Sequence, residues 1–215
     1  MCGIIGYVGR EKAAPILLDG LARMEYRGYD SAGVAVRSEE HGLQVKKSKG
    51  RLQVLSDMIH GGADLEGCLG IGHTRWATHG EPNDINAHPH VSENGAIALV
   101  HNGIIENYLE IKEHLQKLGV VFTSDTDSEV VAQLLEYHYN ECHSMLEAVG
   151  RCLRRIEGSY ALGIICADYP NALIAARKDS PLILGYGKNG NFIASDVTAV
   201  IKYTRDVAYM NDGEI

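Results

Sequence analysis

Short apolar runs alternate with helically spaced apolar residues along the chain, and this pattern predicts a mixture of strands and helices. Residues 4–8 predict a buried strand at the N-terminus, and residues 12–24 carry apolar side chains spaced along one helix face. Further strands are predicted at residues 33–37, 43–47, 69–73 and 96–100. Further helices are predicted at residues 52–59, 107–118, 127–139 and 145–156.

From residue 160 onward the pattern changes to short strands separated by turn residues. These strands are predicted at residues 160–166, 173–176, 182–186 and 191–194, and Asp, Pro, Gly and Asn residues lie between them. The spacing predicts antiparallel hairpins. Residues 206–215 predict a last strand and turn without a polar tail, and we expect the chain to be part of a longer protein.

One polar segment, residues 74–94, has neither helical nor strand periodicity. Its glycines and polar residues predict a long loop. Loops of this length are uncommon inside compact domains and tend to be binding loops or lids.

Length and charge narrow the class of protein. A chain of 215 residues suits one domain with a sizeable core. With 20 Lys and Arg against 28 Asp and Glu, the net charge of -8 argues against a nucleic acid partner. Every apolar run is far shorter than the roughly 20 residues that span a bilayer. We therefore expect no membrane association, and because no secretory signal is recognised we expect a cytoplasmic protein.

The five cysteines form no CxxC pair, and their odd number argues against a disulfide framework. Cys2 differs from the other four by its position. Removal of Met1 would give it a free α-amine beside its thiol, and the two groups have ordinary pKa values of about 8 and about 8.5. Such a pair joins a nucleophile to its own base, as in N-terminal nucleophile enzymes, and needs no cofactor.

Six motifs in this order carry a resemblance that spans nearly the whole chain: MCGIIGYVG, YRGYDSAG, GHTRWATHG, NAHPH, HNGIIEN and SDTDSE. Together they resemble the class II glutaminase domain of the glutamine–fructose-6-phosphate aminotransferases, also called glucosamine-6-phosphate synthases. The resemblance implies an α+β fold, a four-layer αββα sandwich of the N-terminal nucleophile hydrolase type. It also implies that residues 1–215 form the glutaminase domain and that the sugar-isomerase domains are absent from this chain.

The catalytic residues that we expect are Cys2, Asn102 and Gly103. Cys2 is the nucleophile. Asn102 and Gly103 follow a strand that we predict to end at His101, and they suit an oxyanion hole made of a side-chain amide and a backbone N–H. An Asn-Gly pair is also a strong hairpin signal, but residues 104–107 lead towards a helix.

The resemblance implies a substrate site built largely from the GHTRWATHG motif. Arg75 suits a bidentate clamp on the substrate α-carboxylate. Thr78 and His79 are expected to bind the same end of the substrate, and Trp76 to belong to a loop that closes over it. His79 as a general base is the alternative, but a terminal amine makes a catalytic imidazole unnecessary.

Asp127 is expected to pair with the substrate α-ammonium, although a carboxylate at a helix start also suits a cap. Asp125 is expected to be only a cap or turn residue. Arg27 and Asp30 are expected to organise the site around Cys2. A zinc site at His88 and His90, with His101 further on, is not predicted, because no third ligand or catalytic glutamate has a recognisable spacing.

The expected reaction is hydrolysis of L-glutamine to glutamate and ammonia through a Cys2 thioester. In the whole family enzyme the ammonia is used on fructose 6-phosphate bound by the missing domains, and the full-length protein is expected to be a homodimer. One rival is the glutaminase half of a phosphoribosyl pyrophosphate amidotransferase. That family typically has Gln where this chain has Tyr29 and Asn-Leu where it has Ile104 and Ile105. The other rival is a catalytically silent glutamine-binding module.

Overall fold

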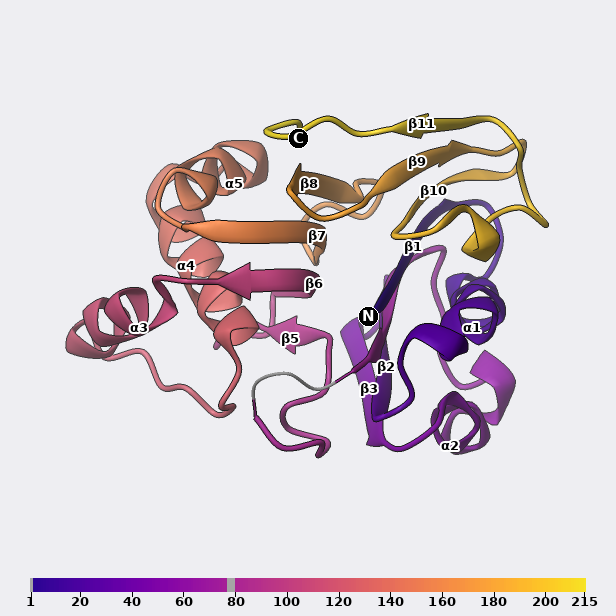
Figure 1. The fold of residues 1–215 in the computed structure, drawn as a ribbon, viewed down its shortest axis with the longest axis horizontal. Helices are drawn as coiled ribbons and strands as arrows, with labels where there is room; N and C mark the ends of the chain where they lie inside the picture. Colours follow the sequence, from indigo (N-terminus) through magenta and orange to yellow (C-terminus); the bar gives the residue numbers. More distant parts are fainter. Residues whose placement is uncertain (1, 77–79) are drawn as a thin grey trace.

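The computed structural model describes residues 2–76 and 80–215, which form two sheets and five α-helices (Figure 1). The strands are β1 Gly3–Gly9, β2 Ser31–Ser38, β3 Gly42–Lys49, β4 Leu69–Arg75, β5 His90–Val91, β6 Ile97–Ile105, β7 Gly158–Cys166, β8 Ile174–Lys178, β9 Ile183–Tyr186, β10 Gly190–Ala194 and β11 Val207–Tyr209. The helices are α1 Ala13–Met24, α2 Leu52–Met58, α3 Tyr108–Lys117, α4 Asp127–Cys142 and α5 Met145–Leu153, with 3-10 turns at Glu25–Arg27, His60–Gly62 and Val197–Ala199.

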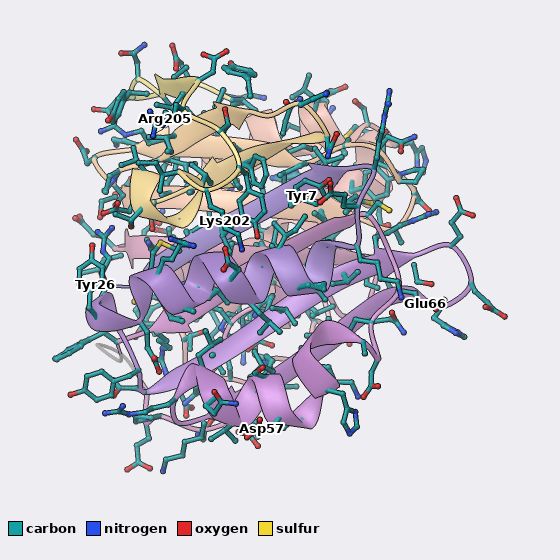
Figure 2. All side chains as sticks on the ribbon, turned by 90° about the vertical axis from the view of Figure 1, so that its right-hand side faces the viewer. Tyr7, Tyr26, Asp57, Glu66, Lys202 and Arg205 are labelled. Carbon is teal, nitrogen blue, oxygen red and sulfur yellow. The ribbon has the colours of Figure 1, made fainter. Side chains whose placement is uncertain are left out.

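The elements stack in four layers. Seven strands form one sheet in the order β11-β9-β10-β1-β4-β2-β3, and β5-β6-β7-β8 form the other, with neighbouring strands antiparallel. Helices α1 and α2 cover the outer face of the seven-stranded sheet, as Figure 2 shows from that side. Helices α3, α4 and α5 cover the outer face of the other sheet. The expected αββα sandwich is therefore confirmed.

Alternation along the central strands divides the apolar side chains among three layers. On β1, Ile5 packs under α1 while Ile4 packs between the sheets. On β6, Leu99 packs against the helices of the second sheet while Ala98 packs between the sheets. Because both faces of these strands are buried, their sequences are apolar runs rather than alternating ones.

The layer between the sheets becomes polar at one end, and this end forms the candidate site. The inward face of β4 continues beyond its apolar residues to His73 and Arg75, and that of β6 continues to Asn102. Ile4 lies opposite His73 in the sheet, so Cys2, two residues before Ile4, lies beside the end of β4. The register that buries the core thus gathers these polar side chains.

Several predicted boundaries were wrong near this end. β4 continues to Arg75, and β5 interrupts the segment that we predicted to be one loop. β6 does not end at His101 but runs to Ile105, and Asn102 and Gly103 pair within the sheet with β7. The Asn-Gly pair therefore lies inside a strand rather than at a hairpin turn.

In the described ranges 2–76 and 80–215, no helix has the length and apolar character needed to cross a bilayer.

Candidate functional site

The Cys2 thiol is held against the backbone at the end of β4. Its Sγ accepts a hydrogen bond from the Trp76 N–H at 3.2 Å, and the thiol donates to the Trp76 carbonyl oxygen at 3.6 Å. Burial raises the pKa of Cys2, while the Trp76 N–H and Arg75 lower it, and Asp30 raises it. The net effect is a raised pKa. The thiol is therefore mainly protonated at neutral pH and needs a base to become a nucleophile.

Cys2 opens into a pocket of about 360 Å³ between the two sheets. Its lining residues are Cys2, Arg27, Trp76, Asn102, Gly103, Ile104, Ser159, Ser180 and Pro181. The pocket thus brings together all three predicted catalytic residues with Arg27 and Trp76. Its volume suits a small metabolite.

Asn102 and Gly103, both on β6, lie beside the Cys2 nucleophile. The Asn102 Nδ2 donates to the Cys2 carbonyl oxygen at 3.2 Å, and its Oδ1 lies 3.0 Å from the His73 Nε2. Gly103 has a φ of 134°, and a Cβ there would collide with the Ser159 carbonyl oxygen. Both observations require glycine at this position, because the backbone here lies too close to the Ser159 carbonyl oxygen on β7 to admit a side chain.

Arg75, at the end of β4, is not among the residues that line this pocket. Its side chain is 5% exposed, and its Nη2 donates to the Gly80 carbonyl oxygen at 3.3 Å. Burial lowers the pKa of the guanidinium, and the nearby acidic groups of Cys2, Asp127 and Asp30 raise it. Arg75 is therefore a buried cation held among acidic groups, close enough to Cys2 to interact with it.

The segment after Arg27 packs closely against the end of β4. The Asp30 N–H donates to the Arg75 carbonyl oxygen at 3.0 Å. A Cβ on Gly28 would lie 2.8 Å from the Arg75 carbonyl carbon, so this approach requires glycine. The Trp76 ring is 45% exposed and meets the Tyr29 ring edge-on at 5.6 Å. Thr78 and His79 lie outside the described residues.

Asp127 begins α4 but does not cap it. The N-cap is Thr126, whose Oγ1 accepts from the Glu129 N–H at 3.3 Å. The capping interpretation was therefore wrong for Asp127. Asp125 is not the cap either, but it lies at a bend just before α4, which agrees with the turn alternative. The Asp127 Oδ2 instead accepts from the Ile105 N–H at 2.8 Å, and its side chain is 8% exposed. Its carboxylate thus links the start of α4 to the end of β6.

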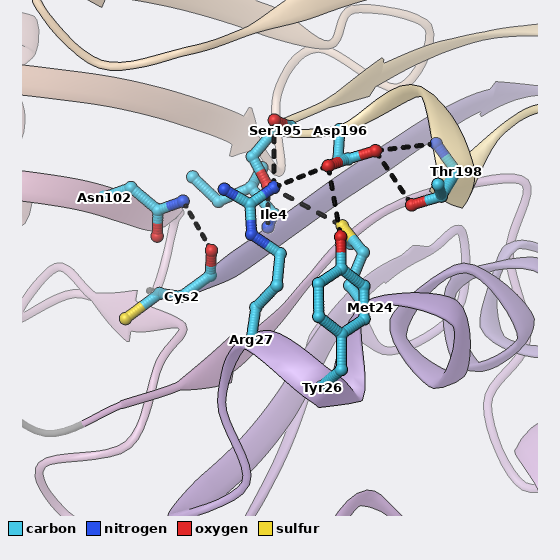
Figure 3. A network of polar contacts seen from close by, with 9 residues as sticks. All are labelled: Cys2, Ile4, Met24, Tyr26, Arg27, Asn102, Ser195, Asp196 and Thr198. Carbon is cyan, nitrogen blue, oxygen red and sulfur yellow. Dashed lines mark hydrogen bonds and ion pairs between the residues drawn. The ribbon is translucent and has the colours of Figure 1, made fainter.

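Arg27, just before β2, bonds the residues that follow β10, the neighbour of β1 in the sheet (Figure 3). Its Nη1 donates to the Asp196 Oδ2 at 3.0 Å and to the Ser195 carbonyl oxygen at 3.4 Å. The Ser195 Oγ accepts from the Ile4 N–H at 2.9 Å. The Arg27 guanidinium therefore fixes residues that hold the start of β1, immediately after Cys2.

Four buried histidines underlie the site: His73, His88, His90 and His101. The His73 and His88 rings stack with centroids 4.2 Å apart, and His90 meets His88 edge-on at 4.6 Å. Burial lowers the pKa of His73 to about 3, and it also lowers the pKa values of the other three. Within the part of the chain that the structure describes, no three metal-ligating side chains converge. The rings are neutral packing and hydrogen-bonding groups.

These histidines predict a specific loss of stability in mild acid. Their pKa values are lower in the folded than in the unfolded state, so below about pH 6.5 the unfolded chain binds more protons. The contribution of these neutral histidines to the free energy of unfolding is fully present above that pH. It falls as the pH decreases, by up to about 1.4 kcal/mol per pH unit for each histidine. Urea unfolding between pH 7.5 and 5.5 measures this slope. The exposed His41→Gln variant is the control and should keep it, whereas a flat profile for the unaltered chain would contradict the prediction.

Several site residues were missed by sequence reasoning. His73 lies inside the quoted GHTRWATHG motif, but nothing in its spacing predicts that it meets Asn102. Asn86, in the NAHPH motif, is 1% exposed, and its Oδ1 accepts from the Asp125 N–H at 3.0 Å. This bond joins the segment around Asn86 to the residues just before α4. Ser195 and Asp196 belong to no motif that we recognised, and they meet Arg27 from about 170 residues away.

Comparisons with known proteins find similar sequences of one family. A family model described as "Glutamine amidotransferase domain" matches residues 73–202. A glutamine–fructose-6-phosphate aminotransferase [isomerizing] of Caldanaerobacter subterraneus is 57% identical over the whole chain, and one of Thermus thermophilus is 54% identical. The chain spans 35% of the length of each of these two curated relatives.

Solved structures give the same fold with lower sequence identity. The glutamine phosphoribosylpyrophosphate amidotransferase of B. subtilis, complexed with ADP and GMP, superposes with a TM-score of 0.81 and 26% identity. That match covers 97% of this chain and 44% of the other. The much higher identity to the fructose-6-phosphate enzymes makes the purine-pathway relationship the more distant one.

Proposed function

Because the chain belongs to the glutamine amidotransferase domain family, we propose that Cys2, freed by removal of Met1, hydrolyses L-glutamine to glutamate and ammonia. The observation that carries this proposal is the meeting of Cys2 with Asn102 and Gly103 in one pocket between the sheets. A nucleophile and two hydrogen-bond donors at one point are what acyl transfer requires.

The reaction begins when the α-amine of Cys2 takes the thiol proton, since the raised pKa of the thiol leaves it protonated at neutral pH. The Trp76 N–H stabilises the sulfur as it becomes anionic. Sγ then bonds to the glutamine δ-carbon, and the carbonyl oxygen becomes an oxyanion. An amide NH₂ has two donors, so Asn102 retains one for the oxyanion while the other bonds the Cys2 carbonyl oxygen. The Gly103 N–H supplies the second oxyanion contact.

Collapse of this intermediate breaks the carbon–nitrogen bond. The protonated α-amine gives its proton to the departing ammonia, and a γ-glutamyl thioester remains on Cys2. Water then attacks the thioester, releases glutamate and restores the thiol. Apart from the substrate and this water, the proposed cycle uses only groups of Cys2, Trp76, Asn102 and Gly103.

The remaining site residues would hold the amino-acid end of glutamine. Arg75 would bind the α-carboxylate and Asp127 the α-ammonium, and both are fixed by hydrogen bonds before substrate arrives. Trp76 would form part of the cover. The resemblance alone supports Thr78 and His79 as further carboxylate contacts. Arg27 and Asp30 would keep the nucleophile and Arg75 in place.

We further propose that residues 1–215 are the glutaminase domain of a longer protein. The relatives that match the whole chain are about three times as long, and their name states that they act on fructose 6-phosphate. In such a protein the ammonia would pass to fructose 6-phosphate on the additional sugar-isomerase domains. The homodimer expected of the full-length protein would depend on those domains.

The deciding experiment measures glutamate release from L-glutamine by chain whose intact mass shows that Met1 is absent. The matched control carries one extra residue before Cys2, which converts the α-amine into an amide and removes the base. We expect release from the processed chain, none from the control, and no glucosamine 6-phosphate when fructose 6-phosphate is added. Equal release by both samples would exclude the amine as base. No release from the processed chain would favour a glutamine-binding module.

A further inference from the structure

We infer that His73 is a positioning residue for this reaction, because its Nε2 holds the Asn102 side-chain amide with the N–H donors towards Cys2. The inference rests on the proposed function. His73 lies on β4 opposite Ile4, two residues beyond Cys2, and is 1% exposed. Its Nε2 is 3.0 Å from the Asn102 Oδ1, a distance typical of a hydrogen bond.

The orientation of the Asn102 amide follows from its two partners. The Cys2 carbonyl oxygen, 3.2 Å from Nδ2, can only accept a hydrogen bond, so the NH₂ group must face it (Figure 3). A flipped amide would place Oδ1 against that carbonyl oxygen, acceptor against acceptor. Oδ1 therefore faces His73, and His73 must carry its proton on Nε2. Only this orientation of the Asn102 amide and this tautomer of His73 satisfy both hydrogen bonds.

The His73 ring is itself held in place and kept neutral. It stacks on His88 with centroids 4.2 Å apart and an interplanar angle of 20°. The His88 Nδ1 in turn accepts from the His101 N–H at 3.3 Å, which fixes that ring to β6 one residue before Asn102. Burial lowers the pKa of His73 to about 3. A neutral donor orients the amide without placing a positive charge beside the Cys2 amine, so it does not oppose protonation of that base.

The orientation matters because the two ends of the amide have opposite effects on the oxyanion. With Nδ2 towards Cys2 the amide donates to the developing charge, and with Oδ1 there it repels that charge. Without the His73 donor, Asn102 loses the bond that holds Oδ1 away from the site. This effect arises in the transition state and should lower kcat, while glutamine binding through other residues is retained.

The test is a double-substitution cycle on glutamate release by the processed chain. His73→Phe keeps an aromatic ring over His88 and removes the donor; we expect kcat to fall about 10- to 100-fold with KM changed less than about 2-fold. In an Asn102→Ala background the same substitution should change kcat by less than about 2-fold, because the group through which it acts is gone. Equal losses in both backgrounds would show a general structural role and overturn the inference, as would an unchanged kcat for His73→Phe alone.

Two conservative substitutions of His73 test the inference if the phenylalanine variant does not fold. His73→Gln can place an amide N–H near the position of the lost Nε2, whereas the shorter His73→Asn cannot. Gln should restore most of kcat and Asn should not, at matched thermal melting temperatures. Equal kcat values for the two would overturn the inference. Failure of the proposed function is distinguishable from this outcome, since then the unaltered processed chain would release no glutamate or Cys2→Ala would still release it.

Discussion

Replacing Cys2 by alanine is expected to abolish glutamate release completely. Sγ is the atom that bonds to substrate, and within the pocket wall that the structure describes Cys2 is the one thiol. Without it no thioester forms, and the remaining donors can only bind the carboxamide. The measurement is glutamate released per chain over long incubation, at an enzyme concentration high enough to detect a rate about 10⁴-fold below normal.

The matched control for this substitution is Cys68→Ala. Cys68 is an exposed free cysteine that lies outside the Cys2 pocket, so its loss should leave turnover unchanged. Calorimetry should show that Cys2→Ala still binds glutamine, because Arg75 and Asp127 are fixed by contacts that do not involve Cys2. If the alanine variant retained measurable release, the nucleophile would have to be assigned to another group.

Replacing Asn102 by alanine is expected to lower kcat about 10²- to 10³-fold, the usual cost of removing one oxyanion donor. KM should change little, because the interaction develops only in the transition state. Steady-state kinetics of glutamate release measure both quantities. A rise in KM at constant kcat would show that Asn102 binds glutamine in the ground state and would remove it from the oxyanion hole.

The control for Asn102 is Asn189→Ala. Asn189 is an exposed asparagine whose Nδ2 bonds the Glu11 Oε1, and it does not line the Cys2 pocket. Its removal should leave kcat unchanged. The Asn102 variant also leaves the His73 Nε2 and the Cys2 carbonyl oxygen without their partner, which costs about 1–3 kcal/mol of stability. Both variants therefore need to be compared well below their melting temperatures.

Local patterns along the chain were sufficient to predict most elements but not how they stack. Residues 4–8 predicted a buried strand, and β1 is buried on both faces. An apolar run of this kind does not say that Ile5 faces α1 while Ile4 faces the other sheet. That assignment depends on pairing between strands far apart in sequence, and only the family resemblance implied it.

The errors in the predicted strand boundaries at the site have a common physical cause. Strand boundaries were placed where apolar character ended, at His73 for β4 and before Asn102 for β6. In the structure both strands continue, because backbone pairing persists after the inward side chains become polar. The residues that make a site polar therefore remove the sequence signal that would have shown them to be in a strand.

The buried histidines illustrate a second limit. His88 and His90 were considered as a metal pair and set aside for want of a third ligand. Spacing along the sequence could not show that rings on separate elements would stack on one another. The motif resemblance identified the reacting groups, whereas the residues that orient them were found only from three-dimensional contacts such as that between His73 and Asn102.

The central place of β1 has a consequence for how the protein matures. β1 lies between β4 and β10, so the strand that follows the nucleophile cannot be fully paired until residues 190–194 have been synthesised. At about 5–20 residues per second, ribosomes need roughly 10–40 s to reach that point. During this interval the amino terminus is not yet enclosed by its final neighbours. An aminopeptidase that acted in this interval would reach the terminus before β1 has gained its second neighbour, β10, and before the Cys2 site is complete.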